Sequence, residues 1–197
     1  ECSFVLGSIS LTVTSTSDCD GDGVTNSQEV SDGTDPLDDC SFVPGSITLA
    51  ITSTSDCDGD GVTNADETTD GTDPTDPCSY IAASATVAPT AAWNTGDCDG
   101  DGVTNGDEVT DGTDPLDDCS FIVTSITVAV TSTSDCDGDG VTNADESTDG
   151  TDPTDNCSFV LASATTAPDA AWNAADCDGD GVTNGQEITD GTDPLDD

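Results

Sequence analysis

Apolar and polar residues alternate in short segments that recur along the chain. In residues 8–14, SISLTVT, every second side chain is a large aliphatic one, and residues 46–52, SITLAIT, repeat the pattern. Alternation with a period of two is typical of strands that are buried on one face. We therefore expect a strand in the apolar part of each copy of the pattern.

The stretches between these segments are rich in Asp, Gly and Pro. Residues 18–39, DCDGDGVTNSQEVSDGTDPLDD, are an example. This composition is unsuitable for a strand or a long helix. We expect at most one helical turn in each stretch, around Asn26–Ser31 in the first, ended by Gly33.

An apolar segment followed by an acidic stretch forms a repeat that occurs five times, and such an array decides the architecture. The acidic parts of repeats 1, 3 and 5 end in DPLDD, whereas those of repeats 2 and 4 end in DPTDP and DPTDN. The apolar part has a short form, SITLAITSTS, and a longer form with AAWN. The pattern is cut within the array at both ends, so we expect a longer natural molecule. The predicted repeats span residues 1–39, 40–77, 78–118, 119–156 and 157–197.

The composition leaves the charge of the chain without an internal counter-ion. The chain has 197 residues, 43 of them Asp or Glu, and no Lys, Arg or His, for a net charge of −43. This charge excludes nucleic acid and anionic membranes as partners. Leu, Ile, Val and Phe make up only roughly 17% of the chain, which is low for a charged chain that folds without other support. No apolar stretch is long enough to insert into a membrane.

Each acidic stretch begins with a loop of EF-hand spacing. In the first loop, residues with oxygen atoms in their side chains stand at positions 1, 3, 5, 9 and 12, and position 7 supplies a backbone carbonyl. Gly23 stands at position 6, where a sharp turn is needed. Oxygen ligands in this number favour Ca²⁺ over Zn²⁺ and transition metals. The predicted ligands are Asp18, Asp20, Asp22, Val24, Asn26, Glu29, Asp56, Asp58, Asp60, Val62, Asn64, Glu67, Asp97, Asp99, Asp101, Val103, Asn105, Glu108, Asp135, Asp137, Asp139, Val141, Asn143, Glu146, Asp176, Asp178, Asp180, Val182, Asn184 and Glu187.

Residues 56–78, DCDGDGVTNADETTDGTDPTDPC, resemble the thrombospondin type 3 repeat in its bacterial form, found in large surface proteins of Bacteroidota. The resemblance implies calcium binding and further aspartates that hold a second ion or a link to the next repeat. The alternative is that Asp35 and Pro36 simply form a turn. The apolar segments are not part of that motif, so we expect strand layers to alternate with metal loops. The further aspartates are Asp32, Asp35, Asp38, Asp70, Asp73, Asp76, Asp111, Asp114, Asp117, Asp149, Asp152, Asp155, Asp190, Asp193 and Asp196.

Each repeat has one cysteine at its start and one at loop position 2. Without His there is no base for a cysteine nucleophile, and carboxylates on both sides disfavour a thiolate ligand. We therefore expect disulfides, each closing a loop of about 20 residues and contributing roughly 3 kcal/mol. Pairing can run upstream, Cys19 with Cys2, or downstream, Cys19 with Cys40, and we favour upstream pairing because it uses all ten. The cysteines are Cys2, Cys19, Cys40, Cys57, Cys78, Cys98, Cys119, Cys136, Cys157 and Cys177.

These features predict a mainly β, linear tandem-repeat array of small disulfide-closed units with irregular calcium loops and no single large core. We expect an extracellular or cell-surface structural protein, not an enzyme, that forms a rigid stalk or filament dependent on Ca²⁺ and disulfides. The alternative is an adhesin or carbohydrate-binding module in which Tyr80, Trp93 and Trp172 stack on sugars; otherwise these aromatics form small cores. Self-association into filaments and O-linked glycans on the TSTS tracts are further expectations.

Overall fold

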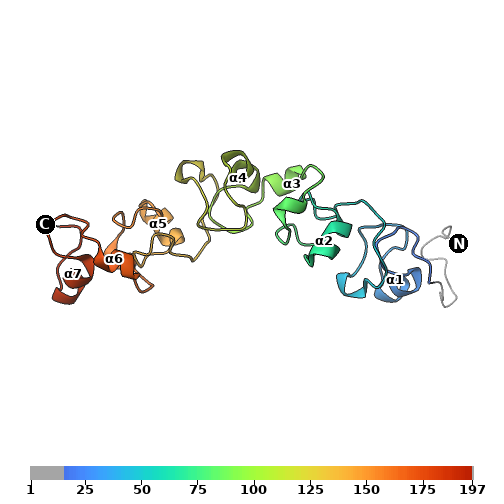
Figure 1. The fold of residues 1–197 in the computed structure, drawn as a ribbon, viewed down its shortest axis with the longest axis horizontal. Helices are drawn as coiled ribbons and strands as arrows, with labels where there is room; N and C mark the ends of the chain where they lie inside the picture. The colour runs from blue at the N-terminus through green and yellow to red at the C-terminus, as the bar shows by residue number, and fades with distance from the viewer. Residues whose placement is uncertain (1–15, 197) are drawn as a thin grey trace. The chain divides into compact units, whose positions relative to one another are not determined.

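The computed structural model describes residues 16–196. Figure 1 shows them as a ribbon coloured by residue number. The chain divides into two compact units, Glu1–Asn94 and Thr95–Asp197. Their boundary lies inside the third repeat, between its apolar segment and its acidic loop. An apolar segment thus belongs to the same unit as the acidic loop that precedes it.

Short helices are the regular secondary structure of residues 16–196. Five α-helices of seven residues each follow an acidic loop, two shorter ones contain the AAWN sequence, and each 3₁₀ turn lies early in an apolar segment. The α-helices are α1 (Asn26–Asp32), α2 (Asn64–Asp70), α3 (Ala91–Asn94), α4 (Asn105–Asp111), α5 (Asn143–Asp149), α6 (Ala170–Ala174) and α7 (Asn184–Asp190), and the 3₁₀ turns are η1 (Pro44–Ser46), η2 (Ala82–Ser84), η3 (Val123–Ser125) and η4 (Leu161–Ser163). None of the described helices has the length and apolar character needed to cross a bilayer.

Local capping defines both ends of four of the seven-residue helices, and in α7 a glycine defines the C-terminal end alone. At α1 the Thr25 hydroxyl accepts a hydrogen bond from the backbone N–H of Gln28, which satisfies one of the free donors of the first turn. At the other end Gly33 adopts a left-handed conformation and donates its N–H to the Glu29 carbonyl. The predicted helix position and its end at Gly33 are therefore confirmed, but the expectation of at most one turn is wrong, because α1 has seven residues.

The expected mainly β fold is wrong, because residues 16–196 contain no β-strand. Residues 47–54 run extended, but a bend at Leu49 interrupts them. Ile47 and Ile51 lie against Gly23 of the preceding loop, whereas Leu49 stays 41% exposed. Alternation predicted an extended, half-buried backbone, but a strand also needs a parallel or antiparallel neighbour along its length. The neighbour here is a tight loop that offers only isolated carbonyls.

Those carbonyls belong to glycines. The N–H groups of Thr48 and Leu49 both point to the Gly23 carbonyl, at 3.0 and 2.9 Å, and those of Thr52 and Ser53 to the Gly21 carbonyl, at 2.8 and 3.0 Å. Each apolar segment of repeats 2 to 5 thus binds to the acidic loop of the repeat before it. The expected strand in residues 8–14 lies outside the described residues.

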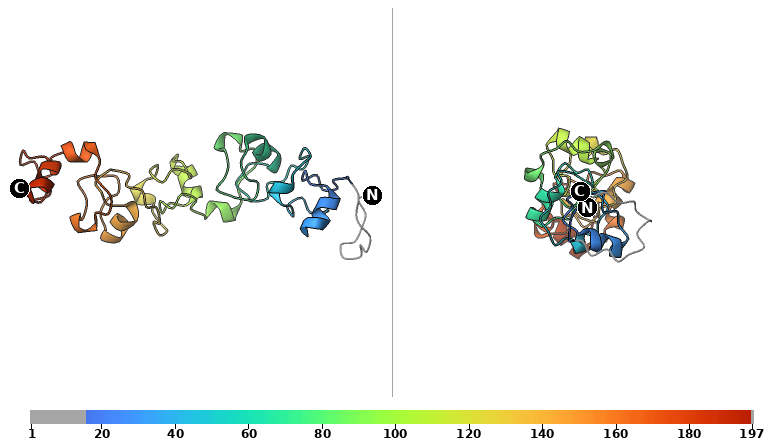
Figure 2. Two further views of the ribbon diagram at one scale, coloured as in Figure 1. Left: turned by 90° about the horizontal axis from the view of Figure 1, so that it is seen from below. Right: turned by 90° about the vertical axis from the view of Figure 1, so that its right-hand side faces the viewer.

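The turn η1 also lies beside α1 of the preceding repeat, as both views show (Figure 1, Figure 2). The Ser46 hydroxyl donates to Oδ2 of Asp32 at the end of α1, at 2.6 Å. Ser125 of η3 and Asp111 of α4 form the same bond. Asp32 and Asp111 therefore link their repeat to the next one.

Two small aromatic clusters form the largest part of the described hydrophobic core, to which Val24, Phe42 and Val103 add further buried side chains. Val62, Tyr80 and Trp93 form one, and the other has the equivalent Val141, Phe159 and Trp172. The rings meet edge to face, with centroids 5.8 Å apart for Tyr80 and Trp93, a favoured arrangement for aromatic pairs. Each cluster joins the valine of one loop to the apolar segment of the next repeat.

Disulfides add a covalent closure to these repeats. Cys40 pairs with Cys57, Cys119 with Cys136, and Cys157 with Cys177. This is the upstream arrangement, in which the bridge runs from the start of the apolar segment to loop position 2. None of the described cysteines is free, and the predicted partner of Cys19, Cys2, lies outside the described residues.

Candidate metal centre

The first aspartate of each loop shapes the backbone. Asp18 Oδ1 accepts the N–H of Gly21 at 2.7 Å, and its Oδ2 accepts the N–H of Gly23 at 3.1 Å. A carboxylate that accepts hydrogen bonds from the following backbone folds it into a tight turn. Asp56, Asp97, Asp135 and Asp176 make the same two bonds in their own loops.

The asparagine at loop position 9 connects the helix to the start of the loop. Asn64 Oδ1 accepts the N–H of Cys57 at 3.1 Å, and its Nδ2 donates to the Cys57 sulfur at 2.9 Å. Asn26, Asn105, Asn143 and Asn184 bind Cys19, Cys98, Cys136 and Cys177 in the same way. The predicted ligand at this position thus uses its amide to brace the loop.

The carboxylates at loop positions 1, 3 and 5 lie close together. Asp18, Asp20 and Asp22 each place one oxygen within 4.8 Å of the others, and the equivalent aspartates of the second and third loops do so too. The glutamate at position 12 is also buried, with Glu29 at 0% exposed. The structure therefore brings positions 1, 3, 5 and 12 of the predicted ligand set together.

Several of these oxygens are buried but have no hydrogen-bond partner in the described residues. They come from the same three loop positions, 3, 5 and 12. Burying an ionised carboxylate without a partner costs several kcal/mol, so such a set indicates a missing positive charge. They are oxygens of Asp20, Asp22, Glu29, Asp58, Asp60, Glu67, Asp99, Asp101, Glu108, Asp137, Asp139, Glu146, Asp178 and Glu187.

The pKa values of these carboxyl groups also indicate that no positive charge of the protein lies near them. Burial, and then the negative charges of the loop aspartates, raise the pKa of four glutamates from 4.5 to about 8: Glu29, Glu67, Glu108 and Glu146. Burial likewise raises the pKa of Asp58 and Asp137 to about 7. Without a cation, the loop favours protonated carboxyl groups.

A hard divalent cation fits this donor set. The free donors are carboxylate oxygens, which Ca²⁺ and Mg²⁺ prefer, and the sulfurs at position 2 are in disulfides. Position 7 adds a backbone carbonyl, and its valine side chain is buried, with Val24 at 0% exposed. The assignment of the individual residues as ligands stays a prediction.

A comparison with protein families matches this geometry to a known repeat. The model for the bacterial TSP3 repeat, the thrombospondin type 3 repeat of bacteria, matches residues 18–39, 56–77, 97–118, 135–156 and 176–197. The chain belongs to the bacterial TSP3 repeat family. TSP3 repeats are a calcium-binding repeat family. A search of curated proteins and a search of solved structures each returned no match.

Each TSP3 match begins at loop position 1, and the first four matches end just before the next cysteine. It therefore covers the loop, the seven-residue helix and the DP turn, and it leaves out the apolar segments. The apolar segments of repeats 2 to 5 lie outside these matches and cover the loops of repeats 1 to 4. The expected resemblance is thus confirmed, with its extent along all five repeats.

The further aspartates of the TSP3 repeat take part in turns. Asp35 Oδ1 accepts the N–H of Leu37, and the N–H of Asp38 bonds the Asp35 carbonyl. The predicted DP turn therefore forms. The charge of Asp35 also contributes to the raised pKa of Glu29, which places Asp35 within electrostatic range of the loop. Its role at a second ion stays a prediction.

Sequence reasoning missed two aspartates that hold the apolar segment in place. Asp39 Oδ2 accepts hydrogen bonds from the hydroxyls of Ser53 and Ser55, and these bonds lower the pKa of Asp39. Asp118 accepts from Ser132 and Ser134 in the same way. The sequence contained a signal for this contact: repeats 1 and 3 end in DD, and the apolar segment that follows each of them ends in STS. We call this arrangement the serine clasp.

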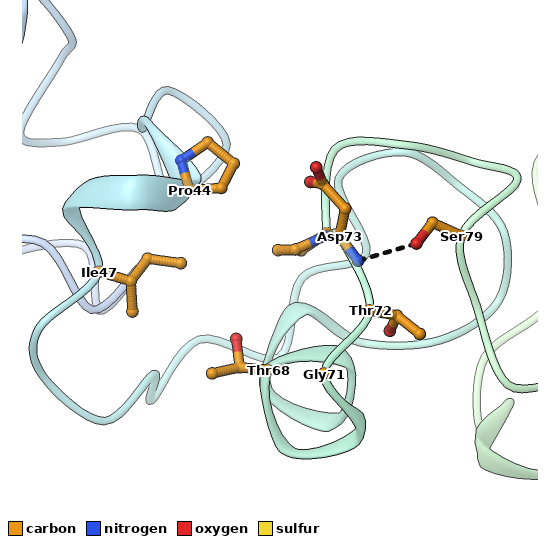
Figure 3. Close-up of a pocket in the computed structure, with 8 residues that line it drawn as sticks. Pro44, Ile47, Thr68, Gly71, Thr72, Asp73 and Ser79 are labelled. Atoms are coloured by element: carbon orange, nitrogen blue, oxygen red, sulfur yellow. Dashed lines mark hydrogen bonds between the residues drawn. The ribbon is translucent and has the colours of Figure 1, made fainter.

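One pocket of about 440 Å³ lies away from the loop carboxylates. Figure 3 shows it between η1 and the end of α2, with Pro44 and Ile47 on one side and Thr68 and Asp73 on the other. It has no aromatic lining residue and no residue from loop positions 1 to 12. The candidate metal centre is therefore separate from this pocket.

Proposed function

We propose that the chain is an extracellular structural protein whose repeats bind Ca²⁺ and that it forms a stiff stalk or filament. One observation carries the proposal: the first four loops hold buried carboxylate oxygens without hydrogen-bond partners at positions 3, 5 and 12, and the fifth loop holds them at positions 3 and 12. Membership of a calcium-binding repeat family supports Ca²⁺ as the ion.

The residues at positions 1, 3, 5 and 12 and the carbonyl at position 7 would hold the ion. Bound Ca²⁺ supplies the positive charge that offsets the repulsion between the loop carboxylates. Asp18 and Asn26 orient the loop backbone through their hydrogen bonds. Because the loop carries the apolar segment of the next repeat, ordering the loop also orders the connection between repeats.

Disulfides support the extracellular location, since such bonds persist in oxidising compartments. The repeats have no large shared core, and each relies on its own loop, helix and bridge. A chain of such units suits a mechanical role more than catalysis, and its family is one of structural calcium-binding repeats. We therefore retain a structural role and not an enzymatic one.

The aromatic residues weigh against the carbohydrate-binding alternative. Tyr80, Trp93 and Trp172 are only 8%, 5% and 1% exposed. A sugar-stacking platform needs an exposed ring face. These side chains instead fill the small cores, so no observation favours the adhesin reading.

Calorimetric titration of the whole chain with Ca²⁺ tests the proposal. The informative variant is Glu108→Gln, which removes the charge of a fully buried loop glutamate, and the matched control is Asp107→Asn, its exposed neighbour in α4. We expect the first to weaken one binding event at least about tenfold and the second to leave all of them unchanged. A chain that binds no Ca²⁺, or equal effects of both variants, would contradict the proposal.

A further inference from the structure

The rings of the two tryptophans pack against the acidic loop of the preceding repeat. Trp93 is buried with Val62 of the second loop, although the third loop begins shortly after it in sequence. Trp172 is buried with Val141 of the fourth loop in the same way, and the fifth loop begins shortly after it. The valine in each of these contacts stands at position 7 of its loop.

Position 7 is the residue whose backbone carbonyl belongs to the predicted ligand set. The side chain of Val141 is 0% exposed, and its N–H donates to Oδ1 of Asp139, at position 5, at 2.8 Å. The other oxygen of Asp139, Oδ2, is one of the buried oxygens without a hydrogen-bond partner. Val62 and Asp60 form the same pair in the second loop. Packing on the valine side chain therefore fixes both its own carbonyl and the neighbouring aspartate.

The ring of Trp172 is itself held on the fourth loop. Its backbone N–H donates to Oδ1 of Asp169, the capping residue of α6, at 2.7 Å. The N–H of Asp169 in turn donates to the Gly138 carbonyl of the fourth loop at 2.8 Å. The ring also meets Phe159 edge to face, with centroids 5.6 Å apart. The short helix that carries the tryptophan thus begins on the loop that the ring supports.

The second loop shows the same arrangement with different residues. Thr90 replaces the capping aspartate: its N–H donates to the Gly59 carbonyl at 2.9 Å, and its hydroxyl accepts the N–H of Trp93 at 3.2 Å. The indole N–H of Trp93 donates to the Pro77 carbonyl at 2.9 Å. Two separate copies therefore place a tryptophan on the position 7 valine, although their capping residues differ.

The first and third loops have a different kind of cover. Ile47 and Ile51 lie against Gly23 of the first loop, and an aliphatic segment covers Gly102 of the third loop in the same manner. These short segments contain no tryptophan. A large aromatic ring with two torsion angles gives a more rigid contact than aliphatic side chains of similar area. The covered loops therefore alternate between an aliphatic and an aromatic support.

We propose that Trp93 and Trp172 are positioning residues of the calcium centres in the second and fourth loops, which form a separate class of site in this chain. The ring holds the position 7 carbonyl and the position 5 aspartate in place before the ion binds. Donors that are already in place lose less conformational freedom on binding, which raises the affinity. This inference rests on the proposed function and assigns each indole ring to one loop.

Tryptophan fluorescence during a Ca²⁺ titration of the whole chain tests the assignment. In the Trp93→Phe chain, Trp172 is the sole tryptophan, and we expect its emission to change as Ca²⁺ binds. Glu146→Gln, in the fourth loop, should shift the midpoint of this change to at least about tenfold higher Ca²⁺. The matched control is Glu187→Gln in the fifth loop, whose Asn184 donates to the Trp172 carbonyl at 3.1 Å. The control should leave the midpoint unchanged. A midpoint that Glu146→Gln leaves in place, or that Glu187→Gln shifts as well, would overturn the inference.

Calorimetric titration measures the positioning effect itself. We expect Trp172→Ala to weaken one Ca²⁺ binding event at least about fivefold through lost preorganisation, and Trp172→Phe to restore most of that affinity. Unchanged binding in Trp172→Ala, or no recovery with Phe, would contradict positioning by the ring. The fluorescence measurement retains Trp172, so it decides the inference independently of whether Trp172→Ala folds. A chain that binds no Ca²⁺ at all would instead be a failure of the proposed function.

Discussion

At the scale of single residues, the loop carboxylates divide into two groups with opposite roles. Asp18 accepts two backbone N–H groups and folds the loop, while Glu29 is buried without any hydrogen-bond partner. The first kind stabilises the loop without an ion. The second kind destabilises the loop in the absence of a cation, so the proposed Ca²⁺ binding would depend on folding and folding on Ca²⁺.

The pH dependence of the cation-free chain follows from the raised pKa of the glutamates. Their pKa of about 8 lies above the ordinary 4.5, so the unfolded chain ionises first as pH rises. The folded state therefore loses stability from about pH 4.5 to about pH 8. We expect a lower melting temperature at pH 8 than at pH 5 in the presence of a chelator.

Calcium should reverse this pH dependence of the melting temperature. Ca²⁺ binds the ionised carboxylates and competes with protons, so its stabilisation should grow with pH. With saturating Ca²⁺ we expect the higher melting temperature at pH 8. Equal melting temperatures at the two pH values in chelator would contradict the assigned burial of the glutamates.

The serine clasp offers a second test at this scale. Ser132 is 6% exposed and donates to Asp118, and a hydrogen bond to a charged group contributes about 1.5 kcal/mol or more. We expect Ser132→Ala to lower the free energy of unfolding by that amount in urea titrations. Thr133→Ala, a change at the exposed neighbouring residue, should have little effect, and a similar loss in both would refute the clasp.

At the scale of elements, each seven-residue helix is too short to be stable by itself, so its ends and its loop determine its position. Thr104 caps α4 at its start and Gly112 ends it, with the Gly112 N–H bonded to the Glu108 carbonyl. The same backbone thus ends the helix and places the glutamate in the candidate metal centre. Helix and loop are therefore one functional element.

Substitutions at two glycines can separate the cost of a left-handed backbone conformation from the cost of disturbing the apolar segment that covers the loop. Gly112 has φ 79° and free space around it, while Gly102 has φ 92° and lies against the covering segment, where an added Cβ would meet Val130 Cγ2 at 2.8 Å. We expect Gly112→Ala to cost about 1–2 kcal/mol from the left-handed conformation alone. Gly102→Ala should cost more, because the covering segment must also move. Urea titration of both variants in Ca²⁺ measures the difference, and equal costs would contradict the contact.

At the scale of the whole molecule, each structural module is a loop with its helix and the apolar segment of the next repeat. The disulfide then links that segment to the following loop, as Cys119 and Cys136 do. Hydrogen bonds, the small cores and the bridges thus alternate along the chain. Contacts between neighbouring repeats hold such a linear array together.

Removing one bridge tests its contribution. For the Cys119→Ser and Cys136→Ser double variant we expect a loss of about 3 kcal/mol, as chain entropy predicts for a closed loop of this size. The cysteines are 17 residues apart in sequence. Thermal unfolding with and without Ca²⁺ measures the loss, and an unchanged melting temperature would contradict a stabilising role of the bridge.

The sequence by itself determined the repeat, the loops and the acidic residues that each loop brings together. These features depend on local spacing, since Gly23 at position 6 and Glu29 at position 12 belong to one short stretch. The helix end at Gly33 was also predictable, because left-handed backbone favours glycine. The family followed from the same residues.

Only the tertiary structure decided what the apolar segments do. Alternation in residues 46–52 indicates which side chains are buried, but it does not identify the surface that buries them. That surface is the loop of the preceding repeat, whose two glycine carbonyls cannot build a ladder of strand hydrogen bonds. The burial of Trp93 and the role of Asp39 depend on the same long-range packing. A local pattern fixes the chemistry of a loop, whereas the partner of an extended segment depends on which surface lies next to it.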